Sequence, residues 1–216
     1  MSQDNKANSN TNKGVRGRLL DAAEELFCEH GFEGASIRDI AASAKCNIAS
    51  VNYYFGGKEN LYIEMFRRHM TSLLDEQIEN IQNVMNSDHP NLEKLLRTLV
   101  VSTLRPLKSN DGERPLLKMM VREILDPHLK TAIMVDELIG KFLTELRNAI
   151  VKLCPGLKSE TGLLCVYSID GIVLHALLFS DYYHQHYPNI KVDELIEHIV
   201  RFSTAGIRAY AEDKTE

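Results

Sequence analysis

The chain has 216 residues and a formal net charge of −5, with 44% hydrophobic and 25% charged residues. These proportions are those of an ordinary soluble globular protein, long enough for one large domain or two small ones. The acidic balance argues against a protein that coats nucleic acid by bulk electrostatics. Residues 1–70 hold nine Lys/Arg and nine Asp/Glu, so any surface that binds a polyanion must be a local patch supported by backbone donors.

Targeting and redox signals place the chain in the cytoplasm. The cysteines are scattered and include no C-x-x-C pair. This distribution fits a reducing compartment and does not match the ligand spacing of a zinc site. Residues 1–14 are polar and lack the apolar core of a signal peptide, so a disordered tail is expected. The apolar stretch Leu163–Ser180 carries Asp170 near its middle, and a central Asp costs ~2.5–3.5 kcal/mol on insertion scales. This stretch is therefore expected to be a buried helix, with no membrane partner.

Helical periodicity runs along the chain and strand signals are nearly missing, which predicts an all-α fold of about nine helices. The first helix carries an apolar stripe over Leu19–Phe27, and Gly31 is its expected end. Two short helices should follow, over about residues 37–44 and 47–55. The later predicted helices are Lys58–Met85, Leu92–Leu104, Pro115–Leu125, Pro127–Leu153, Glu160–His186 and Val192–Ala211. A polar linker, Arg105–Arg114, follows the helix Leu92–Leu104. A break at Cys154–Gly156 follows the helix that ends at Leu153.

The two short helices have clear local signals. Ser36 precedes the first, with Asp39 three residues later, a variant of the capping box. Asn47 can cap the second, and Gly56 and Gly57 end it. Two short helices joined in this way form the unit that places one helix in the major groove of DNA.

Phosphate and base contacts can be assigned from this unit. Helix N-termini near Ser36, Asn47 and Lys58 present backbone N–H groups and a partial positive charge. Bases would be read by the outward side of the second helix, where Asn can pair with adenine and an apolar side chain can meet a thymine methyl. Basic residues before the first helix, Lys13, Arg16 and Arg18, could form an arm. The candidate DNA-binding residues are Arg16, Ser36, Arg38, Asn47, Ile48, Ser50, Asn52, Tyr53, Tyr54 and Lys58. Alternatively, the two tyrosines cover the core and Lys58 is a solvated surface lysine.

The motif Leu26-Phe27-x-x-x-Gly31-Phe32-x-x-x-Ser36-Ile37-x-x-Ile40-Ala41-x-x-Ala44, followed by Tyr54-Phe55-x-Gly57-Lys58-Glu59-x-Leu61, closely resembles the N-terminal domain of the TetR family of transcriptional regulators. The resemblance covers about residues 15–62, and Lys118–Pro127 more loosely resembles the C-terminal domain of one TetR subgroup. It implies a homodimer that binds a palindromic operator with the helix at Asn47–Phe55 in the major groove. The family usually has glycine where Lys45 stands, so strain is expected there.

The resemblance also implies that residues 63–216 form a domain for ligand binding and dimerisation, with a small-molecule effector as partner. Methionines suit an irregular cavity, although at helical spacing they are more often plain core residues. Arg122 and Glu123 could anchor a ligand, form a structural ion pair or lie on a solvated face, and His175 could be a core histidine. The candidate ligand-binding residues are Met70, Met119, Arg122, Glu123 and His175.

The last two predicted helices suit self-association. Small side chains at Ser168, Gly171 and Ala176 allow close helix approach, and Ile196–Ile207 form an apolar stripe. Ordinary packing within one chain is the alternative.

No phosphate-binding loop, nucleophile motif or paired Glu-x-x-His appears, so an enzyme, a metal site and a cofactor are not expected. The sequence therefore predicts a ligand-responsive transcriptional repressor. The alternative is a helical protein-interaction or ligand-storage module that does not bind DNA.

Overall fold

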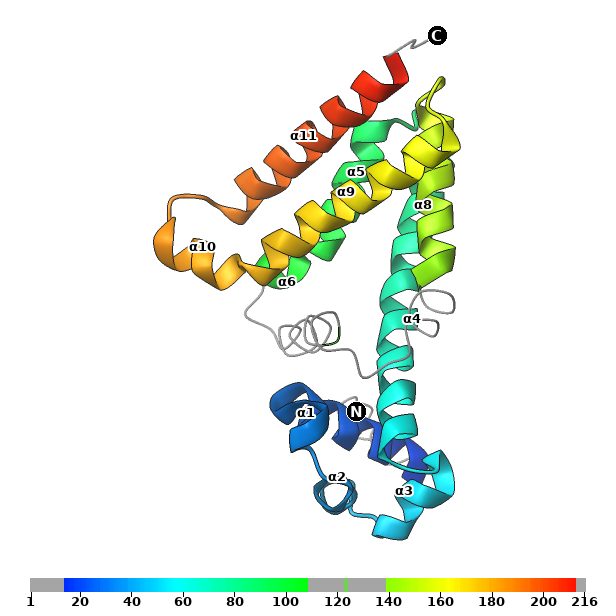
Figure 1. The fold of residues 1–216 in the computed structure, drawn as a ribbon, viewed down its shortest axis with the longest axis vertical. Coiled ribbons are helices and arrows are strands. Elements are labelled where there is room, and N and C mark those ends of the chain that lie inside the picture. The colour runs from blue at the N-terminus through cyan, green and yellow to red at the C-terminus, as the bar shows by residue number, and fades with distance from the viewer. Residues whose placement is uncertain (1–13, 109–122, 124–138, 213–216) are drawn as a thin grey trace, which may run out of the picture. The chain divides into compact units, whose positions relative to one another are not determined.

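The computed structural model describes residues 14–108, 123 and 139–212, and within these ranges it contains ten helices and no strand (Figure 1). The predicted all-α class is confirmed. The predicted tail, the predicted helix Pro115–Leu125 apart from Glu123, and the start of Pro127–Leu153 lie outside the described residues. The chain divides into an N-terminal unit, residues 1–70 with 118–129, and a C-terminal unit, residues 71–117 with 130–216.

The N-terminal unit is built from α1 (Val15–Gly34), α2 (Ile37–Ser43), α3 (Ile48–Phe55) and the first part of α4 (Lys58–Met85). The backbone of α1 leaves helical geometry at Gly31, where φ is 73°, and a last helical stretch follows to Gly34. The predicted end at Gly31 is thus a kink, at a φ that glycine adopts readily. Helices α2 and α3 pack against α1 and against each other. Their apolar faces share one core, whose fully buried members include Leu19, Phe27, Ile40, Val51, Leu61 and Met65.

The C-terminal unit holds the rest of α4 and the helices α5 (Leu92–Thr103), α6 (Arg105–Lys108), α8 (Gly140–Leu153), α9 (Ser159–Leu178), α10 (Ser180–His186) and α11 (Val192–Glu212). Helix α9 packs against α8 and α11, and α11 packs against α5 (Figure 1). One hydrophobic core runs through these helices and includes Leu95, Leu96, Ile150, Val166 and Ile199.

Two boundaries differ from the sequence prediction. Arg105–Lys108 is a short helix rather than linker, since proline at its second position is tolerated in a first helical turn. The predicted helix Glu160–His186 is two helices, because the backbone at Phe179, with φ −101° and ψ 14°, departs from helical geometry. Ser180 and Asp181, at the start of α10, are residue types that favour helix starts, and they are the sequence feature that could have indicated this break.

Helix α9 is, among the described residues, the one that could cross a membrane by length and composition. Seven of its residues are buried, among them Cys165, Val166, Ile169 and Val173, which belong to the core. It is therefore a core helix of the C-terminal unit, as predicted for Leu163–Ser180.

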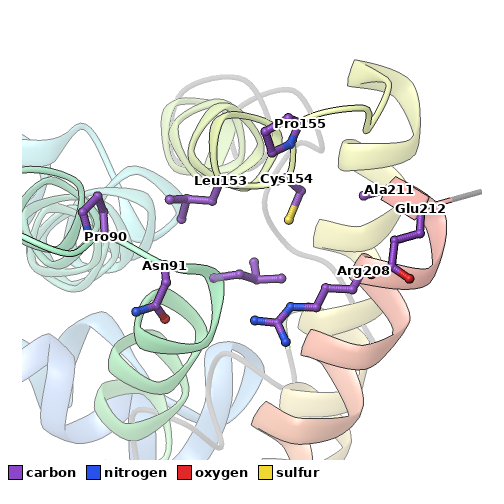
Figure 2. Close-up of a pocket in the computed structure, with 9 residues that line it drawn as sticks. Pro90, Asn91, Leu153, Cys154, Pro155, Arg208, Ala211 and Glu212 are labelled. Atoms are coloured by element: carbon purple, nitrogen blue, oxygen red, sulfur yellow. The ribbon is translucent and has the colours of Figure 1, made fainter.

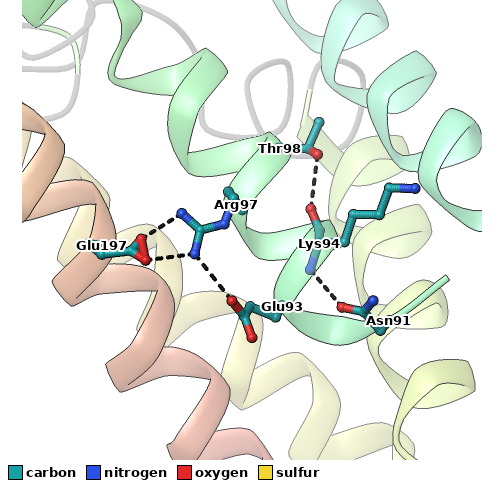
Figure 3. A network of polar contacts seen from close by, with 6 residues as sticks. All are labelled: Asn91, Glu93, Lys94, Arg97, Thr98 and Glu197. Atoms are coloured by element: carbon teal, nitrogen blue, oxygen red, sulfur yellow. Dashed lines mark hydrogen bonds and ion pairs between the residues drawn. The ribbon is translucent and has the colours of Figure 1, made fainter. Parts of the chain in front are cut away.

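Arg97 ties α5 to α11 by a network of polar contacts (Figure 3). Its guanidinium donates to both carboxylate oxygens of Glu197, at 2.5 and 2.8 Å, and to Glu93 at 3.2 Å. These hydrogen bonds lower the pKa of Glu197 and raise that of Arg97. Asn91 caps the same helix by accepting from the Lys94 amide at 2.9 Å. The start of α5 is thus held in place from two sides.

Candidate nucleic-acid interface

Local side-chain contacts build the two-helix unit. The Asp39 amide donates to Ser36 Oγ at 3.1 Å, and the Ser36 hydroxyl donates to Asp39 Oδ2 at 2.5 Å. This arrangement confirms the predicted cap of α2. The Ala49 amide donates to Asn47 Oδ1 at 2.9 Å, which confirms the cap of α3. Each capping side chain accepts from an amide only two or three residues later, so the starting points of α2 and α3 are set by local residues.

The turn between the helices carries backbone strain at Lys45. Its φ is 53°, the left-handed region that costs a residue with a Cβ about 1–2 kcal/mol. The conformation is stabilised by the Cys46 amide, which donates to Ala41 O at 2.9 Å. The Arg18 guanidinium also braces the turn, by donating to Ala44 O at 3.2 Å. Arg18 therefore has a structural role besides its predicted place in an arm.

Helix α3 presents one face to the core and the other to solvent. Val51 and Phe55 are buried, and Gly56 ends the helix in the left-handed conformation with φ 75°. Tyr53, on the opposite face, is 82% exposed, and Ile48, in the first turn of the helix, is 49% exposed. Asn52 is exposed as well, whereas Ser50 is half-buried. An amide, an isoleucine and a tyrosine ring are thus available to base edges from one short helix.

The two tyrosines do not lie in the core. Tyr54 is 41% exposed, and its ring meets that of Tyr53 edge to face, with centroids 4.9 Å apart. Both side chains are therefore available to a ligand at the surface of the unit.

The basic candidates have different surroundings. Arg38 is exposed on α2. Lys58 Nζ lies 4.5 Å from the centroid of the Phe32 ring and donates to Glu33 O at 3.5 Å. Lys58, at the start of α4, thus contacts the end of α1 through its ammonium group. Its side chain is half-buried rather than freely solvated.

Arg16 makes two contacts that the sequence did not indicate. Its guanidinium forms an ion pair with Glu64 of α4 and lies 5.2 Å from the centroid of the Phe55 ring. Glu64 stands 48 residues further along the chain, so no local pattern could identify it. These contacts join α1, α3 and α4 at one point of the unit.

The predicted ligand-binding residues that the structure describes belong to both units. Met70 and Glu123 are buried within the N-terminal unit, and the Glu123 carboxylate accepts a hydrogen bond from Tyr62. His175 belongs to the C-terminal unit, where its ring stacks on Phe179. Met119 and Arg122 lie outside the described residues. Among the described residues, Met70, Glu123 and His175 do not line the pocket of about 310 Å³ in the C-terminal unit (Figure 2).

Comparison with known proteins matches both parts of the chain. Residues 19–65 match the model of bacterial regulatory proteins of the tetR family. Residues 92–207 match the model of the C-terminal domain of the HTH-type transcriptional dual regulator CecR. CecR of Shigella flexneri is 29% identical over 144 residues, which are 62% of this chain and 61% of CecR. The chain spans less than two thirds of the length of the curated relatives that it matches.

Solved structures share the fold. A TetR-family regulator from Mesorhizobium loti has a TM-score of 0.68 at 17% identity, covering 90% of this chain and 95% of that one. FadR of Bacillus subtilis, solved in complex with stearoyl-CoA, has a TM-score of 0.62 at 17% identity, covering 90% and 97%.

Proposed function

The chain belongs to the TetR family of transcriptional regulators, and on that premise we propose that it is a repressor that binds a palindromic operator as a homodimer and releases it when a small molecule binds. Residues 15–62 would be the DNA-binding domain, and residues 63–216 would bind the ligand and the second subunit. The observation that carries the proposal is that α3 is capped at both ends and exposes Ile48, Asn52 and Tyr53.

DNA contacts of two kinds are proposed. Ser36, Arg38, Asn47, Tyr54 and Lys58 would bind phosphates and fix the register, with Arg16 joining them from α1. Ile48, Ser50, Asn52 and Tyr53 would read bases. In a homodimer the two reading helices must lie about one DNA turn apart, ~34–36 Å, to enter successive major grooves.

Self-association would use α9 and α11. Large apolar side chains on these helices are exposed in the single chain, namely Leu164, Tyr167, Leu178, Phe202 and Tyr210. Gly171 and Gly206 have open space around them and leave room for close approach. Two such helices from each subunit would bury this face in an isologous four-helix interface.

The effector is proposed to act through α4, which begins in the N-terminal unit and ends in the C-terminal one. A ligand that binds the DNA-incompetent conformation more tightly would shift the population away from the operator complex. The stearoyl-CoA complex of FadR makes acyl-CoA thioesters the first class of effector to try. Met70, Met119, Arg122, Glu123 and His175 are the residues proposed for this role.

The test is selection of bound duplexes from random-sequence DNA by the full chain, followed by a salt titration with the enriched sequence. We expect an inverted repeat, two chains per duplex in sedimentation, and an affinity that falls as salt rises. If no sequence is enriched and no salt-dependent binding is seen, the chain is a helical interaction or ligand-storage module instead.

A further inference from the structure

A pocket of about 310 Å³ lies where three helices of the C-terminal unit end or begin (Figure 2). The start of α5 contributes Asn91 and Leu92, the end of α8 contributes Leu153 and Cys154, and the last turns of α11 contribute Arg208. The volume is at the lower end of the range for small-molecule sites. Its described lining residues are not among those proposed above for DNA or effector binding.

The walls of the pocket are held in place by contacts of their own. Gly156, with φ 103°, lets the turn after α8 lie against the end of α11, where an added Cβ would come within 2.9 Å of Ala211 O. The Leu157 amide closes this turn on Cys154 O at 3.1 Å. On the other side the Asn91 cap and the Arg97–Glu197 contact fix the start of α5 against α11. The pocket is therefore preorganised, which lowers the cost of binding.

One positive charge enters this space. Figure 2 shows the Arg208 guanidinium pointing toward the start of α5 and away from the Glu212 carboxylate. Within the described part of the chain, Arg208 makes no hydrogen bond or ion pair. The first amides of α5, ahead of the capped Lys94 amide, also lack partners within their helix. Guanidinium and helix start both favour an oxygen anion between them.

Cys154 adds a buried polar atom to the same space. Its side chain is 6% exposed, and Figure 2 shows the sulfur directed into the pocket. Burial raises the pKa of this thiol against the opposing effect of Arg208. The thiol is therefore protonated at neutral pH, which makes it a weak donor rather than a nucleophile.

Apolar residues complete the lining beside the polar groups. Pro90, Leu92, Leu153, Pro155 and Ala211 surround the polar groups. The acidic side chain Glu212 also lines the pocket and disfavours a ligand with two negative charges, such as phosphate. A planar, singly charged head group that pairs with one guanidinium, joined to a short apolar chain, matches these surroundings.

We propose that this pocket binds a short-chain aliphatic carboxylate, with its carboxylate on Arg208 and its chain against Leu92, Leu153 and Pro155. The lining residues are not among those proposed for operator or effector binding, so this proposal does not depend on the proposed function.

The test is calorimetric titration of the full chain with sodium hexanoate, and with hexanol, hexylamine and sodium phosphate as comparison ligands. Hexanoate should bind saturably and more tightly than the other three. Arg208→Gln should weaken hexanoate binding about two- to five-fold, the loss expected for one ion pair with an exposed guanidinium. Arg201→Gln, an equally exposed arginine two turns earlier on α11 that does not line the pocket, is the matched control and should leave the affinity unchanged.

A second variant tests the position of the chain. Ala211→Leu fills part of the pocket without removing a charge and should weaken hexanoate binding while the circular dichroism and melting temperature stay near those of the parent. The proposal is overturned if hexanoate does not bind, if hexanol or phosphate binds equally well, or if Arg208→Gln and Arg201→Gln have equal effects. None of these results bears on operator binding, which is measured separately.

Discussion

The Tyr62 hydroxyl donates a hydrogen bond to the Glu123 carboxylate at 2.9 Å, although 61 residues separate the two along the chain. Both side chains are buried, and Glu123 is fully so. The Tyr62 ring packs edge to face against Phe27 and Phe32 of α1, with centroids 5.0 and 5.1 Å away. A residue from the middle of the chain is thus fastened to the aromatic core beside the DNA-binding helices.

Tyr62→Phe should lower the stability of the N-terminal unit, since it keeps the ring and removes a donor from a buried carboxylate. The expected loss is about 1–3 kcal/mol. Native-state hydrogen exchange of amides in α1 and α4 would measure it for this unit alone. Tyr187→Phe removes an equivalent hydroxyl from a side chain that is 49% exposed and should change nothing. Equal effects of the two variants would contradict a role for the hydrogen bond.

Lys45→Gly should stabilise the protein, because glycine adopts the observed φ of 53° without the Cβ clash. We expect a gain of about 0.5–1 kcal/mol after the greater backbone entropy of glycine in the unfolded chain is subtracted. Urea denaturation would measure it. Ala42→Gly, at an exposed helical position three residues earlier, should have the opposite sign. A loss of stability in Lys45→Gly would mean that the turn is not strained.

Arg38→Ala and Asn52→Ala should separate phosphate contacts from base reading. Loss of the Arg38 contact should weaken binding to all sequences and reduce the slope of log affinity against log salt by about 0.9, the value for one phosphate. Asn52→Ala should leave the slope unchanged and alter base preference at one position. Lys152→Ala, an exposed lysine of the C-terminal unit, is the control. Identical behaviour of Arg38→Ala and Lys152→Ala would exclude Arg38 from the interface.

Glu64→Gln should strengthen DNA binding, because the Arg16 guanidinium that pairs with Glu64 would become available to a phosphate. The affinity should rise, and the salt slope should steepen by at most about 0.9. Glu59→Gln removes the same charge from an exposed residue of the same helix and should leave the slope unchanged. Weaker binding by Glu64→Gln would instead show that the ion pair holds Arg16 in its binding position.

Glu197→Gln should flatten the acid limb of the stability profile. Hydrogen bonds from Arg97 lower the pKa of Glu197 from its usual 4.5, so the ionised form stabilises the folded chain. This contribution is fully present above pH ~4.5 and is lost as the pH falls through the lowered folded-state pKa. Thermal melts between pH 3 and 7 would follow it. Glu79→Gln, an exposed glutamate of α4, should keep the parent profile.

Much of the DNA-binding unit could be predicted from the sequence, because its signals act over two or three residues. Ser36 and Asn47 start their helices through amides that lie next to them in the chain. Gly56 ends α3 because a left-handed residue is needed at that point. The apolar period of Val51 and Phe55 likewise decided which side of α3 faces the core. In each case the side chain and the backbone group that it satisfies belong to one turn.

Only the tertiary structure decided which distant side chains meet. The pairing of Arg16 with Glu64, the bond from Tyr62 to Glu123 and the opening of Arg208 into a pocket depend on helices that are far apart in sequence. The apolar periodicity also did not predict the break between α9 and α10 at Phe179. The local sequence pattern determines which face of a helix is apolar. Which other helix covers that face depends on how whole apolar faces are buried in the folded chain. A sequence pattern therefore identifies the exposed residues of α3, and packing alone determines what surrounds Arg16, Glu123 and Arg208.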